Sequence, residues 1–133
     1  MSGLAPWGHQ ALWSCTARHV GDARRFVRYH LEGLGLAAVA SDVSLAVSEL
    51  ATNAVVHAGT PFTVTLVGMR GQVTIAVGDL SPVQLPAGWP AVGQLDRPHG
   101  RGFQIVQALS SACGVISDGK GKSVWASFDT GDE

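Results

Sequence analysis

The sequence has few charged residues and no clustered basic segment. Only 14% of its 133 residues are charged, the formal net charge is −1, and its longest basic block is the pair Arg24-Arg25. A direct nucleic-acid partner is therefore not expected, because neutralising phosphates requires clustered Lys and Arg. With so few charges, much of the surface must be neutral or apolar, which favours a protein that keeps protein partners.

Cysteines, long apolar runs and targeting signals are equally scarce. The two cysteines, Cys15 and Cys113, lie far apart and match no metal-binding or redox spacing. We interpret both as reduced core residues. No uninterrupted apolar run reaches the roughly 18 residues of a membrane span, and no signal peptide opens the chain. The prediction is a cytoplasmic protein without a membrane partner. The five histidines show no ligand spacing, and no Ser/His/Asp order indicates a hydrolase.

The length and the hydrophobic periodicity predict one domain over residues 9–129, preceded by a loose segment 1–8. Ser41 and Asp42 are expected to cap the second helix, and Gly59 to close it. The order of elements predicts an α+β fold, a two-layer sandwich with helices on one face of a largely antiparallel mixed sheet. The elements expected are strands over 9–16, 62–69, 72–77, 115–116 and 123–128, helices over 20–32, 41–58 and 102–113, and a long loop over 78–99.

One row of polar residues interrupts the second predicted helix. Glu49, Asn53 and His57 recur every fourth residue within an otherwise apolar run. At about 100° per residue, they follow one border of the core stripe and would line a cleft. On this row alone, the simpler interpretation is a surface Glu that neighbours an Asn and a His. The expected core stripe itself consists of Val43, Ala46, Val47, Leu50 and Ala54.

Three further segments carry candidate chemistry, and each has a simpler interpretation when taken alone. Asp79 follows an apolar strand, where it could point into a pocket floor or only form a turn. The segment 99–106 brackets a helix start with glycines, which suits either an anion site or a tight turn. The segment 119–125 carries two lysines and a serine into the last strand. It is not a P-loop, because the spacing differs and a strand follows.

Taken in order, these segments resemble one family. ExxxN on a helix, DxSP after a strand, GRGxxIV opening a helix and GKxVWA on a final strand resemble the ATP-binding domain of the GHKL superfamily, which has the Bergerat fold. Within it, SELxTNAVxHA, DxSP and HGRGxxIV are similar to the small anti-sigma-factor serine/threonine kinases of actinobacteria. The resemblance runs from about Ala17 to Phe128, nearly the whole chain.

The resemblance implies a role for individual residues. Glu49 matches the general base, Asn53 the Mg²⁺ ligand and Asp79 the residue that anchors adenine. Residues 83–99 occupy the place of the ATP lid. His57 is left open, as a contact to the sheet or to the loop. The remaining nucleotide-binding residues implied are Ser81, Gly100, Arg101, Gly102, Lys122 and Ser123, with Lys122 as a phosphate contact.

The implied function is an anti-sigma factor with ATP- and Mg²⁺-dependent serine/threonine kinase activity. It would phosphorylate an anti-anti-sigma (STAS-type) antagonist, sequester a sigma factor and form a homodimer. An alternative from another class is a binding module that sequesters its partner with nucleotide as a structural ligand or none. A third is a bare ATPase subunit. The sequence has no phosphoacceptor-helix domain, which excludes histidine-kinase activity in cis.

Overall fold

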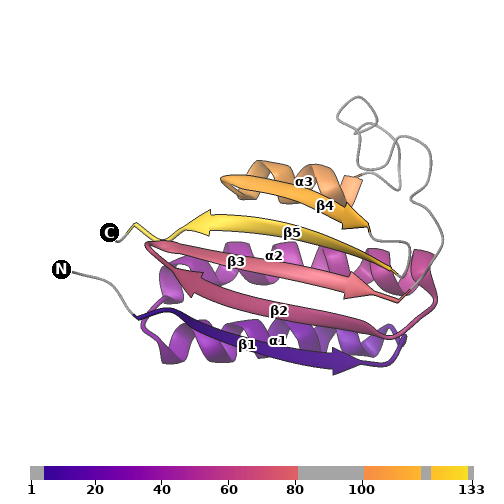
Figure 1. The fold of residues 1–133 in the computed structure, drawn as a ribbon. Coiled ribbons are helices and arrows are strands. Elements are labelled where there is room, and N and C mark those ends of the chain that lie inside the picture. Colours follow the sequence, from indigo (N-terminus) through magenta and orange to yellow (C-terminus); the bar gives the residue numbers. More distant parts are fainter. Residues whose placement is uncertain (1–4, 81–100, 118–120, 132–133) are drawn as a thin grey trace.

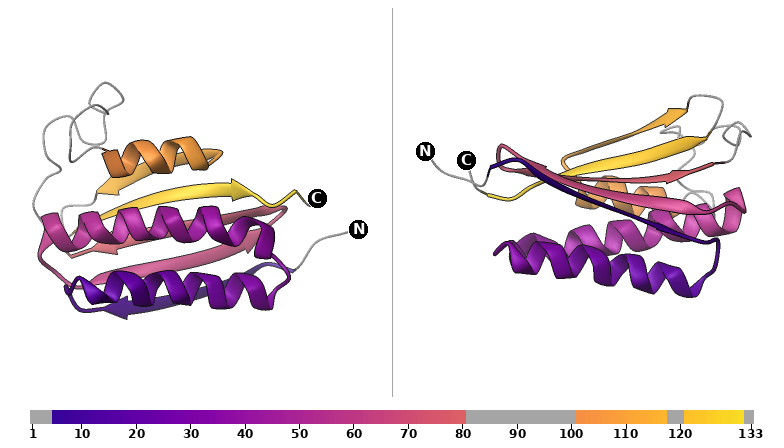
Figure 2. Two further views of the ribbon diagram at one scale, coloured as in Figure 1. Left: turned by 180° about the vertical axis from the view of Figure 1, so that it is seen from behind. Right: turned by 60° about the horizontal axis from the view of Figure 1, so that its bottom comes forward.

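The protein is described from a computed structural model, which defines residues 5–80, 101–117 and 121–131. Across these residues, five strands form one sheet in the order β1-β2-β3-β5-β4, and every neighbouring pair is antiparallel. Helices cover one face of this sheet, so the molecule has two layers (Figures 1 and 2). The predicted α+β sandwich is confirmed. The strands are β1 (Trp7–Trp13), β2 (Phe62–Met69), β3 (Gln72–Asp79), β4 (Ala112–Ser117) and β5 (Lys122–Asp129).

The helical layer consists of α1 (Arg18–Gly33), α2 (Ala37–Asn53) and α3 (Arg101–Leu109). The strand β3 alternates strictly, with every second side chain buried against the helices and the others on the open face of the sheet. Alternation with period two and a buried helical stripe together produce a single core between the layers. The stripe predicted for α2 is buried in full: Val43, Ala46, Val47, Leu50 and Ala54.

Several predicted element boundaries were wrong. The first strand begins at Trp7 and ends at Trp13, so residues 7 and 8 pair with β2 instead of lying in a loose segment. The second helix begins at Ala37, and no side-chain cap bonds to its first turn. Ser41 and Asp42 therefore lie inside α2. The alanine-rich start explains this difference, because alanine has the highest helix propensity and extends the helix toward Gly35.

The third helix also differs from its prediction. It ends at Leu109 rather than continuing to Cys113, which lies in β4. The backbone N–H of Ser111 donates to the Ser127 carbonyl, so the chain turns into the sheet at this point. Serines favour such a turn, since their hydroxyls compete with helical hydrogen bonds. Residues 102–113, predicted as one helix, thus form most of a short helix and the start of the edge strand β4.

Aromatic rings connect α1 to β1. Trp13 contacts the ring of Phe26 edge-on, with centroids 5.6 Å apart. His9 and His30 stack with their centroids 3.7 Å apart and their planes at 15°. Burial lowers the pKa of His30 below its ordinary value of 6.5, and the neighbouring His9 lowers it further. The imidazole of His30 therefore favours its neutral form.

The helical stretch Ala37–Ala58 is long and apolar enough, by length and composition, to cross a membrane. The core helix of a globular fold passes the same test. Half of the apolar window is buried inside this fold, and α2 packs against the sheet. The hydropathy of this stretch is accounted for by its place in the core.

Candidate functional site

The polar row of α2 lies at the end of the helix. Glu49 and Asn53 are half-buried, whereas His57 is exposed. Directly after Asn53 the helix widens into the π-helical turn η1 (Ala54–Ala58), which closes at Gly59 with a left-handed φ of 67°. π-helical turns within helices are frequent at functional sites. Glu49 and Asn53 therefore share the border of the core that the sequence predicted, but the exposed His57 does not share their burial.

The start of α3 lies directly against this row. A Cβ added at Gly102 would stand 3.0 Å from Oε1 of Glu49 and 3.3 Å from Nδ2 of Asn53. Only a residue without a side chain allows this approach without displacing its neighbours. The fold thus brings the glycine of the GRG motif into contact with the two polar residues of α2, which lie about fifty positions earlier in the chain.

The amide of Asn53 offers the chemistry of a metal ligand. Its Nδ2 atom is buried and has no hydrogen-bond partner within the described residues. The oxygen and nitrogen of an Asn amide are assigned from their partners, so either atom can occupy this position. A carbonyl oxygen there would suit Mg²⁺, which takes few protein ligands and retains phosphate and water oxygens. Among the described residues, no group of three or more His, Cys, Asp or Glu side chains could hold a metal by itself.

The end of β3 carries a buried carboxylate that is paired with a cation. Asp79 is the last residue of β3, and its side chain is 3% exposed. Nζ of Lys122 donates to Oδ2 of Asp79 at 2.7 Å. The backbone N–H of the next residue, Leu80, donates to the Thr60 hydroxyl at 3.0 Å, which ties this end of β3 to the segment that follows η1. Asp79 therefore lies at the same end of the fold as the C-terminus of α2.

A close backbone contact positions Lys122. A Cβ at Gly121 would stand 2.1 Å from the carbonyl oxygen of Asp79, so no side chain can be accommodated there. The first residue of β5 is consequently held against the last residue of β3. Lys122 has the same parity in β5 as the buried Val124, and its side chain points toward the helical layer, as Asp79 does.

Ser123 has the opposite orientation. It pairs with Gly78, and its hydroxyl would stand 3.8 Å from a Cβ at that glycine, on the open face of the sheet. The structure therefore brings Lys122, but not Ser123, to the carboxylate of Asp79. The sequence of β5 indicates the face on which Lys122 lies, because residues two apart in a strand share a face and Val124 is buried. The Lys122–Asp79 pair was nevertheless missed by the sequence reasoning.

A cavity of about 300 Å³ lies beside the ion pair. Asp79 and Lys122 line it together with neutral polar side chains of the open face, such as Thr63 and Ser123. Its volume is at the lower end of ligand-binding pockets. Neither Glu49 nor Asn53 contributes to its lining, so this cavity and the cluster on α2 are separate features that adjoin the same end of the sheet.

Some predicted site residues lie outside the described residues. They are Ser81, Gly100 and the predicted lid at 83–99. Arg101 opens α3, but only its backbone is described. The roles assigned to these residues therefore stay predictions.

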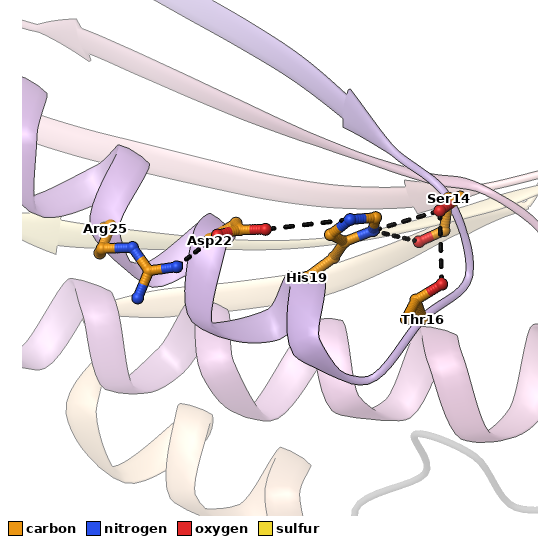
Figure 3. Close-up of polar contacts among 5 residues, drawn as sticks. All are labelled: Ser14, Thr16, His19, Asp22 and Arg25. Atoms are coloured by element: carbon orange, nitrogen blue, oxygen red, sulfur yellow. Dashed lines mark hydrogen bonds and ion pairs between the residues drawn. The ribbon is translucent and has the colours of Figure 1, made fainter.

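A second polar cluster lies where β1 leads into α1 (Figure 3). Nδ1 of His19 lies 3.2 Å from the Ser14 hydroxyl and 3.1 Å from the Ser14 carbonyl, while its Nε2 lies 3.9 Å from Asp22. Arg25 pairs with Asp22 on its other side. A carbonyl only accepts, so Nδ1 carries its proton when it bonds there and cannot then deprotonate Ser14. This cluster fixes the start of α1 and is not a catalytic triad.

Comparison with known proteins identifies the family. A family model described as the histidine kinase-like ATPase domain matches residues 13–128. The chain belongs to this family. The histidine kinase-like ATPase domain implies use of ATP at the level of the family, and it accounts for nearly the whole chain.

Solved structures agree on the fold of this histidine kinase-like ATPase domain. The chain is similar to a crystal structure of the RsbU and RsbW domains of Rv1364c from Mycobacterium tuberculosis, with a TM-score of 0.68 and 19% identity. The alignment covers 92% of this chain but 32% of the other, so this chain spans about a third of that protein. No match is found among the curated proteins.

Proposed function

We propose that this histidine kinase-like ATPase domain is an anti-sigma factor with ATP- and Mg²⁺-dependent serine/threonine kinase activity. Its substrate would be a hydroxyl of a STAS-type anti-anti-sigma protein, and its second partner a sigma factor. The observation that carries the proposal is the contact of Gly102 with Glu49 and Asn53. This contact supports the proposal because Glu49, Asn53 and the start of α3 lie next to one another.

The start of α3 supplies the phosphate-binding part of the proposed site. The first N–H groups of a helix have no partner within the helix, and they lie at the positive end of its dipole. Because Gly102 has no side chain, a phosphate could approach these groups next to Asn53. Magnesium bound there through the Asn53 amide would neutralise charge on the phosphate oxygens.

The half-buried carboxylate of Glu49 is suited to act as the general base. In the proposed reaction, the substrate hydroxyl oxygen bonds to the γ-phosphorus as the bond to the β-bridging oxygen breaks, and ADP leaves. The hydroxyl proton passes to the carboxylate of Glu49. Such a base typically contributes about 10²- to 10⁴-fold to the rate. The buried Asp79 is the proposed acceptor for the exocyclic amine of adenine.

The proposed assembly is supported by the sparsely charged open face of the sheet. Leu12, Met69 and Ile116 are exposed apolar residues on strands β1, β2 and β4. The face suits contact with other proteins, and we propose that the domain forms a homodimer in the cytoplasm. The alternative of a non-catalytic binding module needs no base, so the presence of Glu49 beside Asn53 favours the enzyme.

Calorimetric titration with Mg·ATP tests the nucleotide-binding part of this proposal. The unmodified protein should bind Mg·ATP, and Asp79→Asn should weaken binding about ten- to a hundredfold, because a hydrogen bond to a charged group contributes about 1.5–3 kcal/mol. Thermal unfolding of the same samples controls for loss of fold. Absence of binding by the unmodified protein would refute the kinase and leave the binding module.

A further inference from the structure

Lys122 covers the carboxylate that is the proposed adenine acceptor. The Lys122 side chain is 14% exposed and that of Asp79 3%, so Lys122 is the more exposed member of the pair. Nζ of Lys122 donates to Oδ2 of Asp79 at 2.7 Å, a distance in the range of a strong charge-assisted hydrogen bond. An incoming amine donor would approach the same carboxylate, beside this ammonium.

The backbone prevents Lys122 from moving away as a whole. Gly121 is packed against the carbonyl of Asp79, and Ser123, the residue after Lys122, pairs with Gly78 in the ladder between β3 and β5. Displacement of the ammonium therefore requires rotation of the Lys122 side chain while its backbone remains fixed. A lysine side chain has four rotatable bonds, so such a rotation is accessible, but it breaks the ion pair.

We propose that Lys122 is a latch that competes with the nucleobase for Asp79 and so sets the nucleotide affinity of the domain. This inference rests on the proposed function, because it takes an adenine nucleotide as the ligand of Asp79. It differs from the role implied by sequence resemblance, in which Lys122 would contact phosphate. The two roles have opposite consequences: removing a latch tightens binding, whereas removing a phosphate contact weakens it.

Calorimetric titration with Mg·ATP of Lys122→Met distinguishes them. Methionine approximates the volume of the lysine stem and removes the charge. We expect the Kd for Mg·ATP to fall at least about tenfold, because a hydrogen bond to a charged group contributes at least about that factor in affinity. Lys122→Arg keeps a cation opposite Asp79, so Kd should not fall.

Two matched controls separate the latch from general effects of charge. Arg70 lies in the turn between β2 and β3, at the opposite end of these strands from Asp79, and has a positive φ of 54°. Arg70→Asn removes one positive charge and tolerates this backbone conformation; Kd should not fall. In an Asp79→Asn background, Lys122→Met should give no tightening, because the latch acts only through that carboxylate.

The base provides a further control. Inosine triphosphate carries a carbonyl where ATP carries the amine, so it lacks the exocyclic donor that an uncovered carboxylate would accept. Lys122→Met should therefore tighten ATP but not inosine triphosphate. A variant that merely altered the fold would not separate these two ligands.

A measurement on the unmodified protein does not depend on the folding of any variant. The chain has two lysines, Lys120 and Lys122, so their ammonium signals in NMR spectra can be assigned with Lys120→Arg. Saturating ATP should shift the Lys122 signal. Failure to shift it would overturn the latch.

The titrations separate failure of the latch from failure of the proposed function. If the unmodified protein binds ATP and Lys122→Met binds it equally or more weakly, the latch is refuted and the function stands. If neither binds ATP, both are refuted.

Discussion

Replacement of Gly102 by alanine tests the arrangement of the site at its closest contact. The added Cβ would stand 3.0 Å from Oε1 of Glu49, 3.3 Å from Nδ2 of Asn53 and 3.6 Å from Cβ of Glu49. Well-packed heavy atoms are separated by about 3.5–4.0 Å. The carboxylate must therefore move by a few tenths of an ångström, away from the start of α3.

The substitution should affect activity and stability differently. A displacement of about 1 Å can cost about a hundredfold in rate, so a shift of a few tenths should cost roughly three- to tenfold in phosphoryl transfer. Alanine stabilises a helix relative to glycine by about 0.5–1 kcal/mol, which offsets the strain of the contact. We expect the free energy of unfolding of Gly102→Ala to change by less than about 1 kcal/mol.

Steady-state ATP turnover and chemical denaturation of the same preparations provide the two readouts. Gly33→Ala is a matched control, because it also adds a methyl group at a helix residue but meets nothing within 4 Å. It should leave turnover unchanged. Full activity of Gly102→Ala at unchanged stability would show that Glu49 and Asn53 need not be held against α3, and the proposed site would fail.

Two further predictions address the metal and the pH dependence. Asn53→Ala should weaken ATP binding in magnesium far more than in EDTA, measured by calorimetry; equal losses would show that Asn53 is only structural. Because the folded-state pKa of His30 is lowered below 6.5, the folded protein binds fewer protons than the unfolded chain below that pH. The free energy of unfolding should therefore fall as the pH drops from about 6.5, and denaturation of His30→Gln should show a smaller fall; an equal fall would exclude His30 as the cause.

Much of the fold could be predicted because one physical pattern dominated each element. The strict alternation of β2 and β3 and the helical stripe around Val47 each bury one face, so periodicity located them. The boundaries of the helices and strands were harder to predict from the sequence. Ser41 and Asp42 resemble N-caps in sequence. The helix nevertheless begins before them, at Ala37, because the preceding alanines have a high helix propensity.

The candidate site could be predicted only in part. Spacing of four placed Glu49 and Asn53 on one border of α2, because that relation is local to a helix. Their contact with Gly102 depends on how α3 packs on α2, which no local pattern specifies. The ion pair of Asp79 and Lys122 likewise depends on the register between β3 and β5. The alternation of β5 alone indicates on which face of the sheet Lys122 lies, but it does not indicate that Asp79 is its ion-pair partner.

Glu49→Gln provides the most direct test of the central claim, that this domain transfers phosphate with Glu49 as the base. Glutamine keeps the volume and hydrogen-bonding reach of the side chain but cannot accept the proton. The measurement is transfer of label from γ-labelled ATP onto candidate STAS-type antagonists from the same genome, beside calorimetric binding of Mg·ATP. We predict that Glu49→Gln binds Mg·ATP within a few-fold of the unmodified protein and transfers label at least about a hundredfold more slowly. Transfer at the unmodified rate would contradict the assignment of Glu49, and no transfer by the unmodified protein to any antagonist that it binds would contradict the kinase itself.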